Sequence, residues 1–245
     1  MPDQMLLKMQ KVGLVFRKEL ATYFNSTIAY ITLLVFLLLS GWFFSSSFFI
    51  INESDLRVLF SLIPIVFLFF IPAVTMGLIS REQSSGTMEF LVTLPLSDWE
   101  IVVGKYLAAV ALIGVGLLFT MFHLLTLMFV ATDIDPGAIF TGYLGLLLVG
   151  GVYAAAGVFC SSFTNNQITA FIVSFGIVFI FFILDKMLIF FPGFLASILQ
   201  FISIDYHLSN ISRGVIDSRN LIYFASMIGL FLMLSVRVLE MRKWR

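Results

Sequence analysis

Few ionisable side chains lie within the long apolar segments of this sequence, and three of them are candidates for chemistry. His123 lies within one such segment, and Asp185 and Lys186 lie near the end of another. Ionisable groups at membrane depth typically mark ion paths or proton relays. A hydrogen-bonded packing role explains His123 more simply, and Asp185 and Lys186 are close enough to a segment end to reach water. Because the sequence has no series of buried acids, a proton-driven carrier is disfavoured.

The motifs of soluble catalysis are missing. The sequence contains no G-x-x-x-x-G-K-[ST] phosphate loop, no H-E-x-x-H and no G-x-S-x-G. With two histidines, His123 and His207, and one cysteine, Cys160, neither a metal site nor a disulfide is expected. We therefore expect no catalytic residue, no metal and no cofactor in this chain. A serine paired in space with a histidine, as in an intramembrane enzyme, stays open as a minor alternative.

Composition defines the class of protein that must position these residues. Of 245 residues, 60% are hydrophobic and 11% are charged, whereas a soluble domain has about 25% charged residues. The apolar runs are much longer than the ~10 residues of a barrel strand. The sequence therefore predicts an all-α polytopic membrane protein. The net charge of zero gives no attraction to nucleic acid.

Six apolar runs approach the ~20 residues that a spanning helix needs. They cover residues 27–51, 58–80, 102–131, 138–160, 168–190 and 221–239. We expect residues 27–245 to form one six-helix transmembrane domain, preceded by a separate segment at 1–26. The fourth run is rich in glycine and alanine, which suits close helix packing inside the chain or, alternatively, a dimer seam.

Basic residues predict the orientation. A six-span path places ten basic residues on the side of the termini, namely Lys8, Lys11, Arg17, Lys18, Arg81, Lys105, Arg237, Arg242, Lys243 and Arg245. The other side holds Arg57, Lys186, Arg213 and Arg219. Because cytoplasmic loops carry the excess of Lys and Arg, we expect both termini in the cytoplasm of a cell (inner) membrane protein.

Two further segments do not read as spans. Residues 187–220 include an apolar stretch, but Pro192 and Gly193 break it early, so an outer re-entrant hairpin is expected there. Residues 1–26 are amphipathic and favour an interfacial helix that contacts membrane lipids, with basic anchoring of the topology as a compatible role. The candidate residues of that helix are Val12, Phe16, Arg17, Lys18, Glu19 and Leu20.

The stretch between spans two and three, 81–101, is a cytoplasmic island in this topology. Its centre, residues 86–95, suits about two helical turns that Thr87 caps and Pro95 stops. Met88, Phe90, Leu91 and Leu94 give it too much apolar surface for a solvated loop. It must pack beneath the membrane domain or insert into a groove of a separate cytoplasmic protein.

Four segments resemble ABC-2-type transporter permeases. These are REQSSGTMEFLVTLPLSDWEIVVGKYLA, RKELATYFNSTIAYI, SSFTNNQITAF and HLSNISRGVIDSRNLIYF, in the family's order. The last of them is most similar to the gliding-motility type of ABC permease subunit. The resemblance covers nearly the whole chain, although each motif is loose.

The resemblance implies six spans, pairing with a second permease copy, and two copies of a separate ABC ATPase that carry ATP and Mg²⁺. The stretch 81–101 would be the coupling loop. The implied ATPase-coupling residues are Glu82, Gly86, Thr87, Glu89, Leu91, Leu94 and Pro95, with Thr164, Asn165, Asn166 and Gln167 as a second contact. The implied outer gate is the hairpin 187–220, with Pro192, Gly193, Asp205, His207, Arg213, Gly214 and Asp217.

For the gliding type, a membrane-anchored subunit with a large outer domain is an expected companion. The expected function is a permease subunit that couples ATP hydrolysis elsewhere to substrate export or to mechanical work. A membrane-embedded scaffold that transmits force and moves no substrate is the alternative. The sequence does not indicate the transported substrate.

Overall fold

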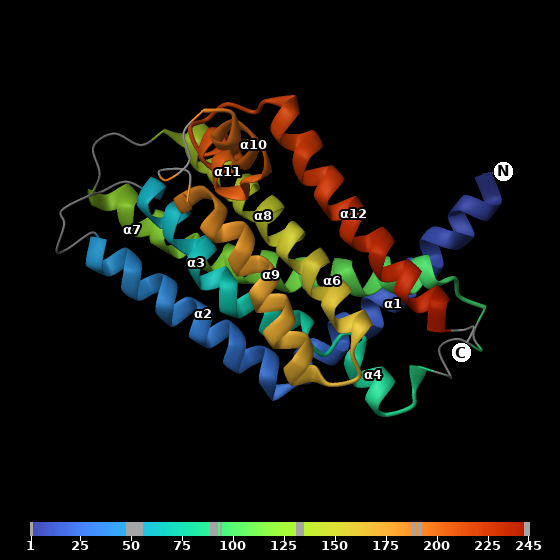
Figure 1. Ribbon diagram of the computed structural model, residues 1–245. Coiled ribbons are helices and arrows are strands. Elements are labelled where there is room, and N and C mark those ends of the chain that lie inside the picture. Colours follow the sequence, from blue (N-terminus) through green and yellow to red (C-terminus); the bar gives the residue numbers. More distant parts are fainter. Residues whose placement is uncertain are drawn as a thin grey trace.

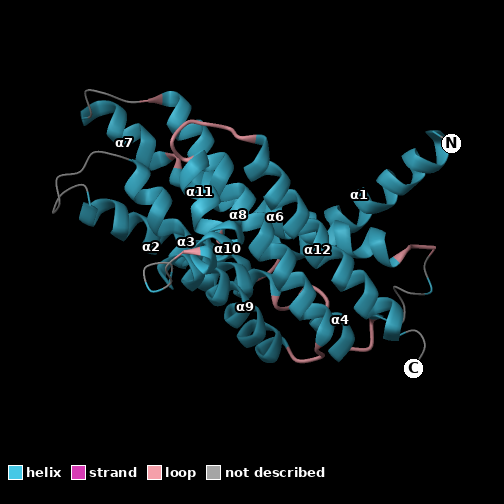
Figure 2. Ribbon diagram, turned by 45° about the horizontal axis from the view of Figure 1, so that its top comes forward, coloured by secondary structure: helices cyan, strands magenta, loops and turns pink. Residues whose placement is uncertain are grey.

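Every regular element in the described part of the chain is a helix. The computed structural model describes residues 2–47, 56–88, 93, 95–130, 135–187, 190 and 193–242, and Figure 2 shows no strand among them. The helices are α1 (Pro2–Phe24), α2 (Thr27–Ser46), α3 (Leu56–Thr75), α4 (Ser80–Ser84), α6 (Asp98–Thr120), α7 (Phe122–Val130), α8 (Pro136–Phe163), α9 (Gln167–Met187), α10 (Phe194–Ile202), α11 (Ile204–Ile211) and α12 (Ser218–Arg242).

Six helices in the described part are long and apolar enough to cross a membrane. They are Thr27–Ser46, Leu59–Ser84, Asp98–Leu127, Pro136–Phe163, Gln167–Met187 and Ser218–Arg242. The predicted all-α polytopic fold with six spans is confirmed. The third span begins at Asp98 instead of residue 102, because Ser97 and Glu100 form a capping box: Ser97 Oγ accepts from Glu100 N, and Glu100 Oε2 accepts from Ser97 N.

Helix α8 lies at the centre of the bundle (Figure 1) and contacts α3, α6, α9 and α12. Its glycines allow this, because a side chain at Gly142 would overlap Phe60 and one at Gly157 would overlap Thr75. The small-residue face of the fourth span therefore serves packing within the chain, and the alternative of a dimer seam there is wrong. By contrast, α2 and α9 present many exposed apolar side chains, as expected for helices that face lipid.

Helix α1 packs against α6, and its N-terminal half projects away from the bundle in both overall views (Figures 1 and 2). Val15 fits against Gly104, where an added Cβ would lie only 2.7 Å from the Val15 side chain. The most buried side chains of α1 are Val15 and Glu19. The predicted apolar side chains Val12, Phe16 and Leu20 are half-buried beside this stripe, while Arg17 and Lys18 are exposed.

Two short helices precede the last span. Helix α10 has nine residues and α11 has eight, so neither reaches the ~20 residues of a span. They lie at the end of the bundle where α9 stops, because Lys186 of α9 contacts Asp205 of α11 at 2.7 Å. Helices α10 and α11 thus lie within the predicted hairpin 187–220, whose outer side and re-entrance stay predictions. Helix α4 lies at the opposite end, where α9 begins (Figure 1).

Candidate functional site

The second span is interrupted just before the candidate coupling residues, and a serine of α8 holds the interruption. Helix α3 ends at Thr75, three residues after Pro72, and α4 begins at Ser80. Between them, Ser161 Oγ accepts hydrogen bonds from the N–H groups of Ile79 and Ser80, both at 3.0 Å, and donates to the Met76 carbonyl at 2.9 Å. One fully buried hydroxyl therefore satisfies the exposed backbone of the break and fixes α4 to α8.

A cluster of four charged residues, which we call the charge cluster, lies beside α4. It comprises Lys18 and Glu19 of α1, Glu82 of α4, and Lys105 of α6. Lys105 is fully buried, and its Nζ lies 2.8 Å from Glu19 Oε1 and 2.8 Å from Glu82 Oε2. The same ammonium group donates to the Leu78 carbonyl at 2.7 Å. Lys105 therefore joins α1, α4 and α6 at one point.

Lys18 closes the charge cluster from the exposed side. Its Nζ lies 2.7 Å from Glu82 Oε1 and 3.2 Å from Glu19 Oε1. Two ammonium groups thus face two carboxylates, and the formal charge of the group is zero. Removing one partner of a buried ion pair costs several kcal/mol of folding stability, because the other charge then remains without compensation.

The electrostatic environment keeps Glu19 and Lys18 of the charge cluster ionised. Burial opposes the charged form of Glu19, but attraction and hydrogen bonding from Lys105 and Lys18 together outweigh it and hold the pKa of Glu19 below its ordinary value of 4.5. Burial likewise opposes the charged form of Lys18, but hydrogen bonding to Glu82 and attraction to Glu19 raise the pKa of Lys18 above 10.5. At neutral pH both residues are charged, as the ion-pair geometry requires.

Part of the candidate coupling loop lies outside the described residues. Glu89, Leu91 and Leu94 belong to that part, and nothing follows here about their positions. Gly86 has φ +71°, a left-handed backbone that favours glycine. The Thr87 hydroxyl lies 2.8 Å from Ser85 Oγ and 3.4 Å from the Glu82 carbonyl, which ties the loop back to α4.

The C-terminal part of the coupling loop, at Pro95, contacts α1. The exposed Pro95 offers its carbonyl to the Lys11 ammonium group, a contact between residues 84 positions apart in sequence. Both ends of the loop therefore contact α1, through Glu82 with Lys18 and through Pro95 with Lys11. The described ends of the loop are therefore attached to α1 at two points.

The second candidate loop, between α8 and α9, reaches the same end. Thr164 Oγ1 accepts from Asn166 N at 3.1 Å, and Asn166 Oδ1 accepts from Ile168 N at 2.8 Å, so these two residues shape the turn and cap α9. Asn165 Oδ1 accepts from Arg242 Nη1 at 2.9 Å, which attaches the end of α12. Gln83 of α4 donates to the Ser162 carbonyl at 3.1 Å, so both predicted contact loops are joined.

Gln167 has a different position from its three neighbours in sequence. Its Oε1 and the Arg81 guanidinium both lie over Gly77, within 3.3 Å of where a Cβ of that residue would be. It therefore contacts the turn after α3 and contributes little to the shape of its own loop. The structure brings all described members of the predicted coupling set to one end of the bundle.

The candidate gate residues gather at the opposite end. Asp205 pairs with Lys186, and His207 is buried with Nδ1 2.7 Å from Asn220 Oδ1 and Nε2 3.0 Å from the Phe201 carbonyl. The His207 ring stacks on Tyr223 with 3.9 Å between ring centroids.

The turn residues of this end have local roles. Gly193 and Gly214 adopt positive φ, and the Asp217 carboxylate accepts from Arg219 N at the start of α12. Arg213 is exposed, and Pro192 lies outside the described residues. His123, a candidate for chemistry within the third span, stacks on Phe44 with 4.6 Å between ring centroids, as a packing residue does. In the described part, no group of three or more His, Cys, Asp or Glu residues could hold a metal ion.

Comparison with known proteins gives one result. The model of a protein family described as "ABC-2 family transporter protein" matches residues 14–210. The matched region includes Lys18, Glu19, Glu82 and Lys105, and it ends within α11. No curated protein matches the chain.

Proposed function

The chain belongs to the ABC-2 transporter family, and we propose that it couples ATP hydrolysis in a separate ATPase to movement of its own membrane helices. Members of this family are membrane-spanning permease subunits of ABC transporters, so an ABC ATPase is the general partner. The observation that carries the proposal is the position of Lys105. This one buried cation connects the candidate coupling segment, the N-terminal helix and the third span.

The proposed path of force begins at the loop that follows α4. A partner that moves this loop displaces Glu82, and Lys105 passes the displacement to α6 and, through Glu19, to α1. The chain continues from α4 into α3, and Ser161 attaches the same segment to α8. Three spans therefore respond together, as an all-or-none change between two arrangements requires.

The orientation follows from charge. The end of the bundle that carries α4 also carries most of the basic residues, so we place it and both termini in the cytoplasm of the inner membrane. Two ATPase copies would then bind beneath a pair of permeases, with ATP and Mg²⁺ held in the ATPases. The hairpin of α10 and α11 would face outward and form the outer gate.

The subgroup is also a proposal. The segment 207–224 is similar to the gliding-motility type, for which we expect a companion subunit with a large outer domain. The copies of the permease would form a homodimer, or a heterodimer with a related chain. Export of a substrate is the activity that the family match favours, and force transmission without transport is the alternative.

The test is co-purification of the ATPase with Leu91→Asp, accompanied by measurement of nucleotide turnover. A buried leucine contributes about 1.5–3 kcal/mol, so the variant should bind the ATPase at least tenfold more weakly, which corresponds to ~1.4 kcal/mol. Val215→Asp is the matched control, because Val215 is an exposed apolar loop residue at the opposite end of the bundle. It should keep the ATPase at full stoichiometry.

A second variant separates assembly from coupling. Glu82→Gln keeps the shape of the side chain but removes the charge that Lys105 and Lys18 share. We expect it to retain the ATPase and to lose the dependence of ATP turnover on the permease. If Leu91→Asp inserts normally, retains its ATPase and hydrolyses ATP like the wild type, the stretch is a passive loop and the proposal fails.

A further inference from the structure

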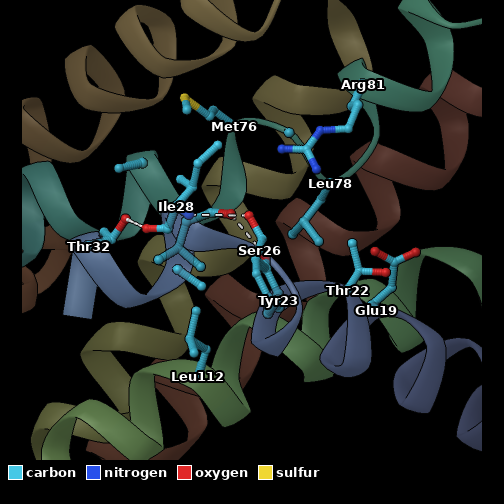
Figure 3. Close-up of a pocket in the computed structure, with 14 residues that line it drawn as sticks. Glu19, Thr22, Tyr23, Ser26, Ile28, Thr32, Met76, Leu78, Arg81 and Leu112 are labelled. Atoms are coloured by element: carbon cyan, nitrogen blue, oxygen red, sulfur yellow. Dashed lines mark hydrogen bonds between the residues drawn. The ribbon is translucent and has the colours of Figure 1, made fainter. Parts of the chain in front are cut away.

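A pocket lies at the α4 end of the bundle, where α1, the start of α2, the end of α3 and α4 meet (Figure 3). Its rim is polar and includes Thr22, Ser26 and Arg81. Its buried lining is apolar and includes Val74 and Leu112. Tyr23 closes part of it by donating a hydrogen bond to the Val74 carbonyl at 2.9 Å.

Arg81 differs from the other cations around the pocket. Lys18 and Lys105 are paired with carboxylates, whereas the Arg81 guanidinium has no ion pair or hydrogen bond to another residue in the described part of the chain. Figure 3 shows this guanidinium turned toward the pocket. Gly77 makes room for it, since a Cβ there would lie 3.3 Å from Arg81 Nη2. The guanidinium carries five donors, which suit a phosphate group.

Glu19, the one carboxylate among the described residues that line the pocket, does not neutralise Arg81. Glu19 directs Oε1 to Lys105 at 2.8 Å and to Lys18 at 3.2 Å, so its charge is already compensated. The pocket therefore combines an uncompensated cation with hydroxyl groups at its rim. This chemistry selects an anion.

An apolar groove of about 260 Å³ along α2 lies next to the pocket. Thr32 and Ala73 line both, and the groove is bounded further by α2, α3 and Phe171 of α9. From Ile31 to Leu39 the groove follows α2 for about 12 Å at 1.5 Å per residue. One leaflet of a membrane contains about 15 Å of hydrocarbon, half of the ~30 Å core.

We propose that the pocket and the groove together bind one anionic phospholipid. The phosphate accepts hydrogen bonds from Arg81, and an acyl chain lies in the groove between α2 and α3. The pocket lies at Ser26, the residue before the first span, so it is at the depth of the lipid headgroups. An amphipathic ligand matches the change from a polar rim to an apolar groove, and a free phosphate would leave the groove unused.

Bound lipid also has a structural consequence. Arg81 is adjacent to Glu82, so a headgroup at Arg81 fixes the α4 segment next to the charge cluster. The lipid stabilises the arrangement in which Glu82 faces Lys105, and membrane composition then influences how readily α4 moves. This consequence is independent of which substrate the protein transports.

The test is titration of the purified full-length protein with phosphatidylglycerol or phosphatidylcholine of identical acyl chains, measured by native mass spectrometry. We expect phosphatidylglycerol to bind at least tenfold more tightly. Arg81→Gln should reduce its affinity to the level of phosphatidylcholine, and Arg81→Lys should keep part of the preference. Arg237→Gln removes a cation at the same end, outside the pocket, and should leave the affinity unchanged.

Two further measurements distinguish a bound lipid from a bound phosphate. Ala73→Phe fills the junction between pocket and groove, and should weaken binding of both lipids if an acyl chain passes there. Soluble glycerol phosphate should bind at least a hundredfold more weakly than phosphatidylglycerol, and equal binding would mean a phosphate site without a lipid. The proposal is overturned if the wild type shows no preference between the lipids, or if Arg81→Gln and Arg237→Gln reduce it equally. It is also overturned if Arg81→Gln releases the ATPase and leaves lipid binding unchanged.

Discussion

The two ends of the bundle hold their ion pairs in different environments. At the α4 end, Lys105 is fully buried between Glu19 and Glu82. At the opposite end, Lys186 is 55% exposed and pairs with Asp205 at 2.7 Å. The distances are similar, but water screens only the second pair. A buried pair fixes the relative positions of its helices, because separating it leaves charges without solvent, whereas an exposed pair can open at little cost.

This difference indicates where the molecule is rigid. Three helices meet at Lys105, so under the proposed function the α4 end would move as one unit when its loop is displaced. The hairpin of α10 and α11 is held instead by ring stacking and hydrogen bonds around His207, with its ion pair facing water. The buried ion pair at one end and the exposed ion pair at the other are the contrast that the proposed transmission of movement predicts.

The largest effect is expected from Lys105→Met. The variant leaves Glu19 and Glu82 facing each other beside one remaining cation, and loss of a buried partner costs about 3–5 kcal/mol. Lys186→Met is the matched control, and loss of an exposed pair costs about 0–1 kcal/mol. Thermal unfolding of both variants in the same detergent measures the contrast. Equal losses of stability would show that burial does not distinguish the two ends.

A smaller effect is expected at the hairpin from His207→Phe. Phenylalanine keeps a ring to stack on Tyr223 but leaves the buried Asn220 without its partner, at a cost of about 1–3 kcal/mol. Protease cleavage between α10 and α12 should accelerate, while the α4 end stays protected. His207→Phe combined with Asn220→Leu removes both polar groups and should recover part of the loss. No recovery in the double variant would argue against this hydrogen bond.

The six-span fold could be predicted from the sequence because the length and apolar composition of each span can be read from its own segment alone. It also brought Glu19 and Glu82 into the candidate set, although on different grounds and without relating them. Lys105 entered the prediction only as one of the ten basic residues that indicate the orientation. The signal that could have identified it is S-D-W-E at 97–100, a capping box that starts the helix at Asp98 and places Lys105 two turns inside.

A lysine at that depth requires acids from other helices, but the sequence does not show which ones. Glu19 and Glu82 are 86 and 23 residues away, and only packing of α1 and α4 on α6 brings them together. The pocket at Arg81 was not predicted for the same reason, since its lining residues come from five helices, α1, α2, α3, α4 and α6. The apolar loop residues Leu91 and Leu94 remain predictions from sequence.

Within the charge cluster, the two α1 residues contribute to stability with opposite dependence on pH. The pKa of Glu19 is lowered, so its contribution to stability is present above its ordinary value of 4.5 and is lost as the pH falls through the lower value in the folded protein. The pKa of Lys18 is raised, so its contribution is present below 10.5 and is lost as the pH rises beyond that.

The difference in melting temperature between wild type and Glu19→Gln should therefore narrow as the pH falls from about 4.5. The measurement is a series of thermal scans from neutral pH to pH 3 in one detergent. A difference for Glu19→Gln that stays constant down to pH 3 would mean that the Glu19 carboxylate does not contribute through its charge.

The smallest effect is expected from Asp205→Asn. The Lys186 ammonium group keeps a second carboxylate, Asp185, at 3.3 Å and lies 5.6 Å from the centre of the Phe182 ring, so it does not lose all compensation. With the Lys186 side chain more than half exposed, the change should stay below about 1 kcal/mol and should shrink further at high salt, because ions screen exposed pairs. Unfolding at low and high salt measures both quantities. A loss of stability as large as that of Lys105→Met, unchanged by salt, would show that the hairpin end depends on its ion pair after all. The contrast between the buried and the exposed ion pair would then be wrong.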